Sequence, residues 1–331
     1  MPTSFKGQSE VESRNTAASD SFVAVPDRCV GTHDGQLLKF LTPCGTGLMT
    51  HPSVVFIPQG ISGYSYWMAG TPYDGVDDSI ENPCIYASHD GATWEIPAGA
   101  TNPVAPKPPG RAHNSDAHLA FDGAALHLWY RRTNDGYDTI LHATSSDGSQ
   151  WSEFDHALRL PQHQERILSP TVCRSGTQWV MYTVKFVRHG NRKVVQRRES
   201  GNPCGPWGAP TNCDINLPDG RLPWHIDVCH AGSQFWMVIA DSTSNEGGDL
   251  FFATSQDGLS FDVAREPLLS RHSSVGNGLY RSALVARPSI ERGGSEIVIA
   301  DAWYSVVDGR RWGVCRGEIS LQTPSNDLPL M

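Results

Sequence analysis

Residues 116–151 decide the fold class, because they form a complete unit that reads DAHLAFDG (116–123), ALHLWYRRT (125–133) and DGYDTILHATSSDGSQW (135–151). In each piece, apolar and polar residues alternate with a period of two over five to eight positions. Gly, Asn or Asp residues bound each piece. This pattern predicts successive antiparallel β-strands joined by tight turns.

The turn at the end of this unit recurs along the chain. Its pattern, Ser-x-Asp-Gly-x-x-aromatic, occurs at Ser88–Trp94, Ser145–Trp151 and Ser255–Phe261, and Ser200–Trp207 is a longer variant. Successive copies lie 54 to 57 residues apart, a period typical of repeat architectures. Asp-Gly favours a hairpin with positive φ, and the Ser and Asp side chains can bond the turn amides. The aromatic residue is predicted to fill the gap between units, so the motif indicates a structural role first.

Five pairs of strands follow from the same comparison. Each pair has a first strand that starts with a polar or aromatic residue and a second strand rich in aromatic or branched residues. A unit of three or four strands cannot bury both of its faces alone, whereas five units arranged radially can. The sequence therefore predicts an all-β fold, a five-bladed β-propeller with four-stranded antiparallel blades around a central channel. The first strands are expected at His51, Asp116, Ser169, Asp227 and Tyr280.

The predicted propeller spans residues 21–322 as one domain. One of two strand-like runs, SFVAVP (21–26) or LLKFLTP (37–43), is expected to close the last blade and so remove a sheet edge. Residues 1–20 are polar and aperiodic, which predicts an arm that stays flexible or becomes ordered by docking, and residues 323–331 are predicted to form a loose tail. The blades are expected at about 45–110, 111–165, 166–220, 221–270 and 271–322.

Composition argues against several classes of function. The chain of 331 residues has a net charge of −9 and no cluster of Lys and Arg, which argues against binding to nucleic acid. No apolar run reaches the roughly 18 residues of a membrane span, and the first residues lack the apolar core of a signal peptide. The sequence therefore predicts a protein made in the cytoplasm, without nucleic acid or membrane as partner. The eight cysteines are expected to be mostly reduced, although Cys204 and Cys213 are close enough in sequence to pair.

Two aspartates give the sharpest indication of chemistry. Asp116 and Asp227 begin the inner strands of different blades, where side chains are expected to point into the mouth of the central channel. Two carboxyl groups that face each other across a pocket can hydrolyse a glycosidic bond, one ionised as base or nucleophile and the other protonated as acid. The alternative is that each aspartate only ties down backbone amides at a blade junction.

Other residues converge on the same mouth. His51, His118 and His225 are expected to act as acid or base, or to bind a metal ion with the aspartates, although a strand histidine is often only a satisfied core residue. Arg281 offers a donor fork for a carboxylate or sugar hydroxyls, or forms a structural salt bridge. Trp224 lies in a Pro-bounded loop and is expected to stack on a sugar ring. The predicted catalytic set is Asp116, Asp227, His51 and His225, and the predicted substrate-binding set is Arg281, Trp224, His118, Glu81 and Tyr73, with Asp78, His113 and Glu165 able to reach in from loops.

The blade repeats, the Ser-x-Asp-Gly-x-x-Trp turns and the starts of the inner strands resemble those of the five-bladed propeller clan that includes arabinanases, xylosidases, invertases, levansucrases and the related neoagaro-oligosaccharide hydrolases. The resemblance covers about residues 45–320. It implies that Asp116 corresponds to the second-blade aspartate that tunes the site in arabinanase-like enzymes. The base and acid of those enzymes are not matched, because His51 and Leu168 stand where an aspartate and a glutamate are expected. The neoagaro-oligosaccharide hydrolases are similar in giving a histidine the role of acid, which His51 or His225 would take here.

The stretches HPSVVF (51–56), YSYWMAGTPY (64–73) and ENPCIYASHDG (81–91) also look like propeller proteins encoded by bacteriophages, which are often hydrolase-like and associated with virions or tails. Two functions are therefore predicted. The first is hydrolysis of glycosidic bonds in a cell-surface or environmental polysaccharide. The alternative is a non-catalytic, glycan-binding or structural component of a phage particle, in which residues 1–20 contact other virion proteins. No cofactor is predicted, unless a structural cation fills the central channel.

Overall fold

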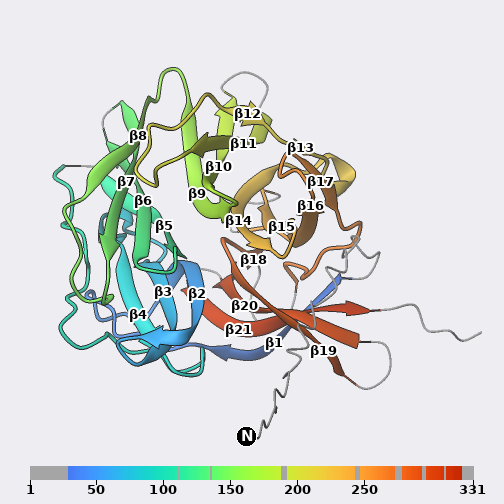
Figure 1. Cartoon of the computed structure of the whole chain (residues 1–331), viewed down its shortest axis with the longest axis horizontal. Coiled ribbons are helices and arrows are strands. Elements are labelled where there is room, and N and C mark those ends of the chain that lie inside the picture. The colour runs from blue at the N-terminus through green and yellow to red at the C-terminus, as the bar shows by residue number, and fades with distance from the viewer. Residues whose placement is uncertain are drawn as a thin grey trace, which may run out of the picture.

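The computed structural model confirms the predicted all-β class and the five-bladed propeller. Five sheets, each built mainly from consecutive strands, lie around a central axis (Figure 1). Within the described part of the chain, no helix is long and apolar enough to cross a membrane. The predicted arm, the run SFVAVP and the predicted tail lie outside the described residues. The structure describes residues 29–110, 112–134, 136–187, 192–242, 247–272, 278–292, 296–308 and 311–322.

The first two blades follow each other in chain order, and all of their strand pairs are antiparallel. The first blade has three strands rather than the expected four, and a single bridge between Ala87 and Glu95 extends its outer edge. The loop between its second and third strands contains the short 3-10 helix η1 (Asp78–Ile80). The strands are β2 (Met49–Ile61), β3 (Tyr64–Pro72) and β4 (Cys84–Ser88) in blade one, and β5 (His113–Phe121), β6 (Leu126–Asn134), β7 (Tyr137–Ser145) and β8 (Asp155–Pro161) in blade two.

The third and fourth blades are joined by a segment with little regular structure. This segment contains the 3-10 helix η2 (Pro218–Gly220) and the two-residue strand β13 (Asp214–Ile215), which pairs parallel with the outer strand of blade four. Blade three consists of β9 (Arg166–Ser175), β10 (Gln178–Val187), β11 (Arg192–Ser200) and β12 (Thr211–Asn212), and blade four of β14 (Pro223–Ala231), β15 (Gln234–Asp241), β16 (Leu250–Ser255) and β17 (Ser260–Val263).

The fifth blade joins the two ends of the described chain. Its strands are β18 (Gly278–Leu279), β19 (Ala283–Arg292), β20 (Glu296–Asp308), β21 (Arg311–Gln322) and the N-terminal β1 (Cys29–Leu37), which pairs antiparallel with β21. The run LLKFLTP is not the closing strand, because only its first residue belongs to β1. Its Phe40 instead packs against Tyr86 of blade one, with 5.0 Å between ring centres, and this contact draws the chain away from the sheet edge.

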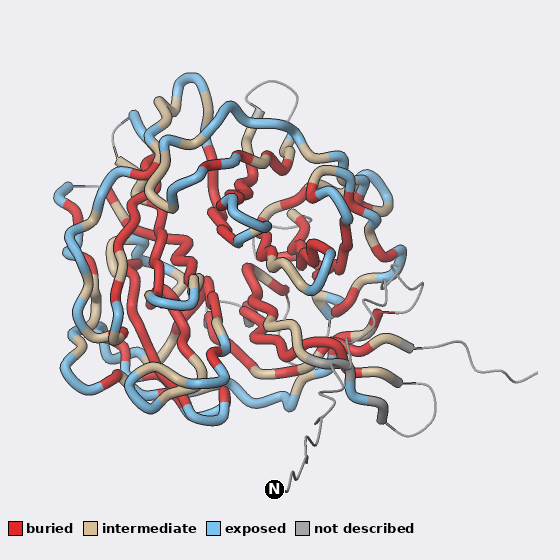
Figure 2. Tube along the Cα trace, in the orientation of Figure 1, coloured by how far each residue is buried: buried red, intermediate tan, exposed pale blue. Residues whose placement is uncertain are grey.

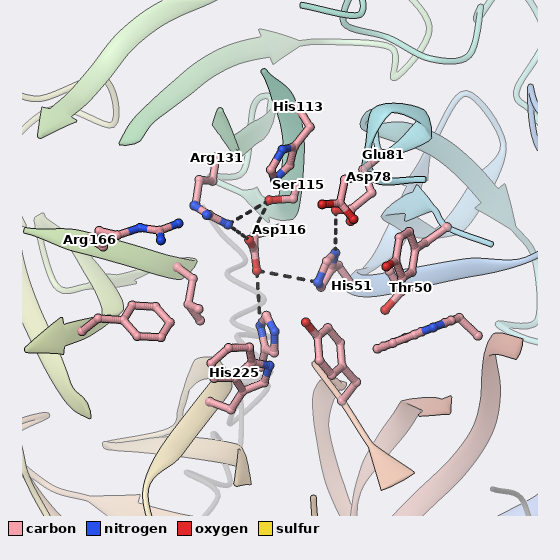
Figure 3. A pocket seen from close by; sticks show the side chains of 16 residues that line it. Thr50, His51, Asp78, Glu81, His113, Ser115, Asp116, Arg131, Arg166 and His225 are labelled. Carbon is pink, nitrogen blue, oxygen red and sulfur yellow. Dashed lines mark hydrogen bonds and ion pairs between the residues drawn. The ribbon is translucent and has the colours of Figure 1, made fainter. Parts of the chain in front are cut away.

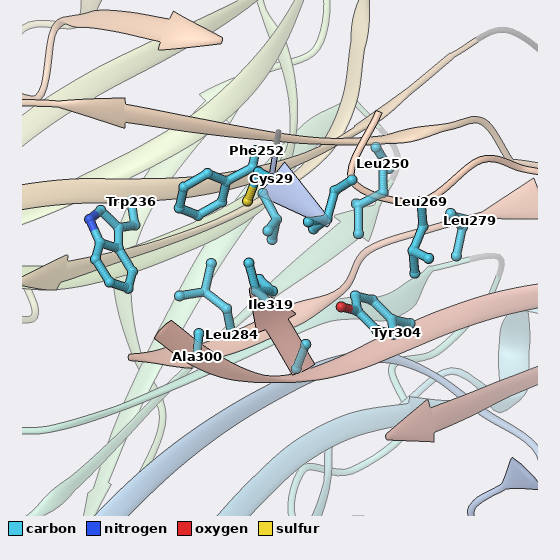
Figure 4. Close-up of a cluster of buried hydrophobic side chains, with 14 of the residues drawn as sticks. Cys29, Trp236, Leu250, Phe252, Leu269, Leu279, Leu284, Ala300, Tyr304 and Ile319 are labelled. Atoms are coloured by element: carbon cyan, nitrogen blue, oxygen red, sulfur yellow. The ribbon is translucent and has the colours of Figure 1, made fainter. Parts of the chain in front are cut away.

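The core lies mainly between neighbouring blades, where buried side chains follow the inner strands (Figure 2). The cluster between blades four and five contains Trp236, Phe252, Tyr304 and Ile319, and Cys29 from β1 joins it (Figure 4). Such apolar burial stabilises the fold by roughly 25 cal/mol per Å² removed from water. Because β1 contributes to this cluster, closure of the ring depends on side-chain packing as well as on backbone hydrogen bonds.

The repeated turns have the predicted hydrogen bonds. The Asp147 carboxylate accepts from the amides of Ser149 and Gln150 at 2.8 and 2.9 Å, and the Ser145 hydroxyl accepts from the amide of Gly148 at 2.8 Å. The turns at Asp90 and Asp257 repeat this arrangement. These bonds satisfy amides that a tight turn leaves without a strand partner.

Aromatic residues on the second strands contact the turn of the next blade. The Trp303 indole donates to the carbonyl of Gly91 at 2.9 Å, closing blade five against blade one. The Tyr182 hydroxyl donates to the Gly258 carbonyl at 2.9 Å, and the Trp129 indole donates to the Pro203 carbonyl at 3.0 Å. The strand aromatics therefore hold neighbouring blades together, which leaves the channel mouth rigid.

A buried histidine pair on blade two predicts acid sensitivity. His127 Nδ1 and His142 Nε2 share a hydrogen bond of 3.0 Å, and burial lowers the pKa of both rings, that of His142 to about 4. Between about pH 6.5 and 4 the unfolded chain binds a proton at His142 that the folded chain does not, so the free energy of unfolding falls as the pH falls. The loss is at most about 3 kcal/mol for this residue.

Urea unfolding between pH 7.5 and 4 measures this effect. The H142Q variant is expected to show a flatter dependence on pH than the wild type, whereas H156Q, which removes an exposed histidine on the outer strand of the same blade, should keep the wild-type slope. Equal slopes for wild type and H142Q would contradict the assignment.

Candidate active site

A pocket of about 340 Å³ opens at one mouth of the channel, near the starts of the inner strands of blades one to four (Figure 3). Its polar wall comes chiefly from blades one and two, and its apolar wall from blades three, four and five. The polar lining residues are Thr50, His51, Asp78, Glu81, His113, Ser115, Asp116, Arg131, Arg166 and His225. The apolar and aromatic ones are Tyr73, Leu168, Phe186, Trp224, Tyr280 and Trp312.

Three inner strands carry the same backbone irregularity at this mouth. His51, Asp116 and Ser169 have φ values of 53°, 53° and 55°, and the pairing register of each strand shifts at that point. Positive φ is costly for a non-glycine residue and typical of functional positions. In a regular strand, neighbouring side chains point to opposite faces. The bulge instead lets both Ser115 and Asp116 line the pocket, and likewise Thr50 and His51.

His51, Asp116 and His225 come together at the centre of the pocket. Asp116 Oδ1 lies 3.8 Å from His51 Nε2 and 3.2 Å from His225 Nδ1. One ligand atom from each residue lies within 4.8 Å of the other two, and all three side chains are buried. His51 Nδ1 bonds to the Thr71 hydroxyl at 2.8 Å, which turns Nε2 toward Asp116. The arrangement directs two imidazoles and a carboxylate at one point.

Two histidines and an arginine surround the central carboxylate. Its Nη1 donates to Asp116 Oδ2 at 3.0 Å, and the Ser115 hydroxyl donates to the same oxygen at 2.9 Å. Burial acts to raise the pKa of Asp116, but His51, His225 and Arg131 outweigh it and hold the pKa well below its usual range. Asp138 lies 3.6 Å from Arg131 Nε and shares the guanidinium charge. At neutral pH the pocket therefore contains an ionised Asp116.

Burial sets the direction of the pKa shift of the other titratable groups at the centre. Burial lowers the pKa of His51 well below its ordinary value, against the attraction of Asp116, and lowers that of His225 in the same way. Burial raises the pKa of Glu81 well above its usual range, and the charges of Asp116 and Asp78 add to this effect. Glu81 Oε2 lies 3.9 Å from His51 Nδ1. The pocket thus contains two carboxyl groups whose pKa values are moved in opposite directions.

A polar network holds the loop that contains Glu81. The Asn114 side chain, fully buried on β5, donates to Asn82 Oδ1 at 2.9 Å and accepts from Arg132 Nε at 2.9 Å. On the outer side, Lys107 Nζ donates to the Ser79 hydroxyl at 2.9 Å. Because Asn82 adjoins Glu81, blade two fixes the position of this blade-one carboxyl group.

Trp224 lines the pocket as predicted from the sequence, but its ring is already in contact on one face. Lys193 Nζ lies 3.9 Å from the centre of the Trp224 ring, and the Phe186 ring meets Trp224 edge-on at 5.5 Å. Burial lowers the pKa of Lys193 to about 8. A sugar ring can therefore contact only the part of Trp224 that Lys193 and Phe186 leave open.

Asp227 does not share this pocket with Asp116, contrary to the arrangement expected from the sequence. It lines a separate cavity of about 360 Å³ together with His118. Asp227 Oδ1 accepts from the Thr171 hydroxyl at 3.2 Å and Oδ2 from the Leu284 amide at 3.3 Å. Asp227 thus ties neighbouring blades together, which is the alternative considered for it.

Arg281 and His118 occupy the channel below the pocket rather than its wall. Arg281 is fully buried, and its Nη2 donates to the Pro170 carbonyl at 2.9 Å and lies 3.3 Å from His118 Nδ1. His118 Nε2 bonds to the Val172 carbonyl at 2.8 Å, and Asp227 Oδ1 lies 3.5 Å from His118 Nδ1. Neither residue lines the pocket, so the structure does not place Arg281 or His118 where they would contact a substrate there.

Of the loop candidates, Tyr73, Asp78, Glu81 and His113 line the pocket. Glu165 does not, because it pairs with Lys185 and Arg198 at 3.3 Å each. Sequence reasoning missed the roles of several lining residues. Arg131 left a signal, since a charged residue at a buried position of a strand needs a partner. The other missed lining residues are Thr50, Ser115, Arg166, Phe186, Tyr280 and Trp312.

Comparison with known proteins places this site on a fold shared with carbohydrate-active hydrolases. No family model matches the chain. A curated relative, A type blood N-acetyl-α-D-galactosamine deacetylase of Flavonifractor plautii, is 26% identical over 94% of this chain, and the chain spans about half of its length, 47%.

The eight cysteines of this chain, Cys204 and Cys213 included, are free thiols.

Solved structures agree in fold. The crystal structure of an N-acetylgalactosamine deacetylase from F. plautii, in complex with blood group B trisaccharide, superposes with a TM-score of 0.77 at 21% identity, covering 88% of this chain and 95% of that one. The α-L-arabinanase of Penicillium chrysogenum with arabinobiose gives 0.58 at 18% identity, covering 88% and 80%. A family 117 glycoside hydrolase of Zobellia galactanivorans gives 0.58 at 13%, covering 91% and 94%. The chain therefore has the five-bladed propeller fold of these proteins.

Proposed function

We propose that this protein hydrolyses the N-acetyl amide of an amino sugar in a glycan. The observation that supports this most directly is the convergence of His51, Asp116 and His225 in a buried pocket beside Glu81, whose pKa burial raises well above its usual range. The relative from F. plautii is named as an N-acetylgalactosamine deacetylase, which agrees with this chemistry.

The central triplet fits a divalent cation. His51 Nε2, Asp116 Oδ1 and His225 Nε2 are buried and form no hydrogen bond within the described part of the chain, although Oδ1 lies 3.2 Å from His225 Nδ1. Neutral imidazoles and an ionised carboxylate are the donors that zinc and related ions prefer. Bound there, such an ion would polarise the acetyl carbonyl and lower the pKa of water.

Other residues of the pocket would donate the proton, orient Asp116 and bind the sugar ring. Glu81, whose pKa burial raises well above its usual range, would give a proton to the leaving amine. Arg131 and Ser115 fix the orientation of Asp116 through its Oδ2, which leaves Oδ1 facing the two histidines. Trp224, Phe186 and Tyr280 provide the apolar wall against which a sugar ring packs.

Hydrolysis of a glycosidic bond is the second candidate. The observation in its favour is that Asp116 and Glu81 line one pocket with pKa values moved in opposite directions, as the two carboxyl groups of a glycosidase require. In this version Glu81 takes the role of acid that the sequence suggested for Asp227 or a histidine. The polysaccharide as partner is common to both candidates.

A non-catalytic role in a phage particle is the third version. It rests on the sequence resemblance to phage-encoded propellers and on the polar residues 1–20, which lie outside the described part of the chain. Deleting these residues should then prevent incorporation into particles without changing the melting temperature of the blades.

Product analysis separates the two hydrolytic candidates. Wild-type protein is incubated with oligosaccharides that contain N-acetylgalactosamine or N-acetylglucosamine, and acetate and new reducing ends are measured in the same samples. Acetate without new reducing ends is the expected result, and prior treatment with EDTA should lower its rate. New reducing ends without acetate would favour the glycosidase, and neither product would count against both.

A further inference from the structure

One wall of the pocket is cationic. Arg166 on β9 pairs with Phe186 on β10, and Phe186 pairs with Lys193 on β11, so the three side chains lie in one row across blade three. Residues directly opposite each other in an antiparallel sheet share a face. Arg166 and Phe186 line the pocket, and Lys193 lies on Trp224, which also lines it. Two positive charges therefore flank the aromatic part of the wall.

These two cations differ from three other basic residues of blade three. Lys185 and Arg198 are both paired with Glu165, and Arg197 with Glu199. The Arg166 side chain is exposed and forms no hydrogen bond or ion pair with any residue that the structure describes. Within the same described residues, Lys193 has only aromatic rings in direct contact with its charge. The charge at this wall is thus available to a ligand.

The opposite wall has the reverse polarity. Asp78 lines it from the β3–β4 loop, which also contains Asp74 and Asp77, and the Glu81 carboxyl group, whose pKa burial raises, lies beside Asp78. The Asp74 carboxylate accepts from the amides of Val76 and Asp77 at 2.9 and 3.0 Å. An elongated ligand that crosses the pocket would therefore place a negative group toward blade three and away from this loop.

We propose that the glycan carries a negatively charged sugar, with a carboxylate or a sulfate ester, next to the sugar that is hydrolysed, and that Arg166 and Lys193 bind this charge. A guanidinium matches the two oxygens of either anion with a pair of charge-assisted hydrogen bonds. Phe186 lies between the two cations in the sheet, and Trp224 contacts Phe186 and Lys193, so that both rings would pack against the acidic sugar. The inference rests on the proposed function only in naming the neighbouring, hydrolysed unit.

Calorimetric titration tests it without requiring turnover. Three tetrasaccharides serve as probes, namely hyaluronan with carboxylates, carrageenan with sulfates, and neutral chitotetraose, each with wild type, R166Q, K193Q and R159Q. Arg159 is the matched control, because it stacks on Tyr137 at the outer strand of blade two, 3.9 Å from the ring centre. Melting temperatures of all four proteins show that each is folded.

We expect one acidic probe to bind the wild type more tightly than chitotetraose does. The affinity for this probe should fall by about tenfold in R166Q and stay unchanged in R159Q. The better acidic probe identifies the anion as carboxylate or sulfate. Added salt should weaken the binding of the acidic probe to the wild type more than its binding to R166Q. Equal affinity for acidic and neutral probes, no binding of either acidic probe, or an unchanged affinity in R166Q would overturn the inference. Because binding is measured, failure of acetate release leaves this result intact.

Discussion

Replacing Asp116 with asparagine is expected to lower kcat/KM for acetate release by about 10³-fold, because the change removes the negative charge on which the site is centred. The neutral amide keeps the size of the side chain but presents an NH₂ group or a weak acceptor to His51 and His225. Arg131 would lose one of its two carboxylate partners and retain Asp138 at 3.6 Å. The measurement is a steady-state assay beside a thermal melt, so that loss of activity is separated from loss of fold.

D227N is the control, and it also tests the role that the sequence suggested for Asp227. Since this carboxylate bonds to Thr171 and to the Leu284 amide outside the pocket, its replacement should lower the melting temperature while kcat stays within a few-fold of wild type. A loss of activity in D227N as large as in D116N, with both proteins folded, would show that the site extends through the channel.

The position of Asp227 shows which part of the site a comparison of the repeated strands could predict and which part it could not. Aligning the strands by their aspartates matched Asp227 with Asp116, and the structure instead brings His225 to the level of Asp116. Aligning the strands by the apolar residues Leu119 and Val228 gives the observed match. Leu119 lies three positions after Asp116, and Val228 lies three positions after His225. A step of two residues keeps a side chain on the same face but moves it about 7 Å along the strand. Because of this distance, His225 lines the pocket, whereas Asp227, two positions later, lies outside it and has a structural role.

Other features of the site have no signature in a single sequence. The positive φ of His51 and Asp116 depends on a bulge against the neighbouring strand, and neither residue type requires it. The contact between Lys193 and Trp224 joins side chains of two neighbouring blades that no local pattern links. The blade count, in contrast, was predictable because five pairs of strands recur along the chain, and three of them are followed by a turn whose Ser, Asp and Gly residues the turn itself needs. Local geometry was thus readable from sequence, whereas contacts between blades were not.

Replacing Gly148 with alanine is expected to destabilise the propeller by at least about 3 kcal/mol. Gly148 has a φ of 76°, which disfavours any side chain, and a Cβ atom there would overlap the ring of Trp67. Trp67 is fully buried between blades one and two and packs against Tyr64 at 5.9 Å between ring centres. The ring has no free space to move into, so the turn would have to move away and expose the junction between the blades.

Gly35 is a control that isolates the effect of the overlap. Its φ of 74° matches that of Gly148, but a Cβ atom at Gly35 would meet no atom within 4 Å. G35A should therefore cost only the backbone term, about 1 kcal/mol. Urea unfolding of both variants gives the difference, and the excess in G148A measures how tightly the repeated turn packs on the preceding blade. If the two variants were equally stable, Gly148 would be needed for its φ alone. Packing of the repeated turns against the preceding blade could then not be what holds the blades together.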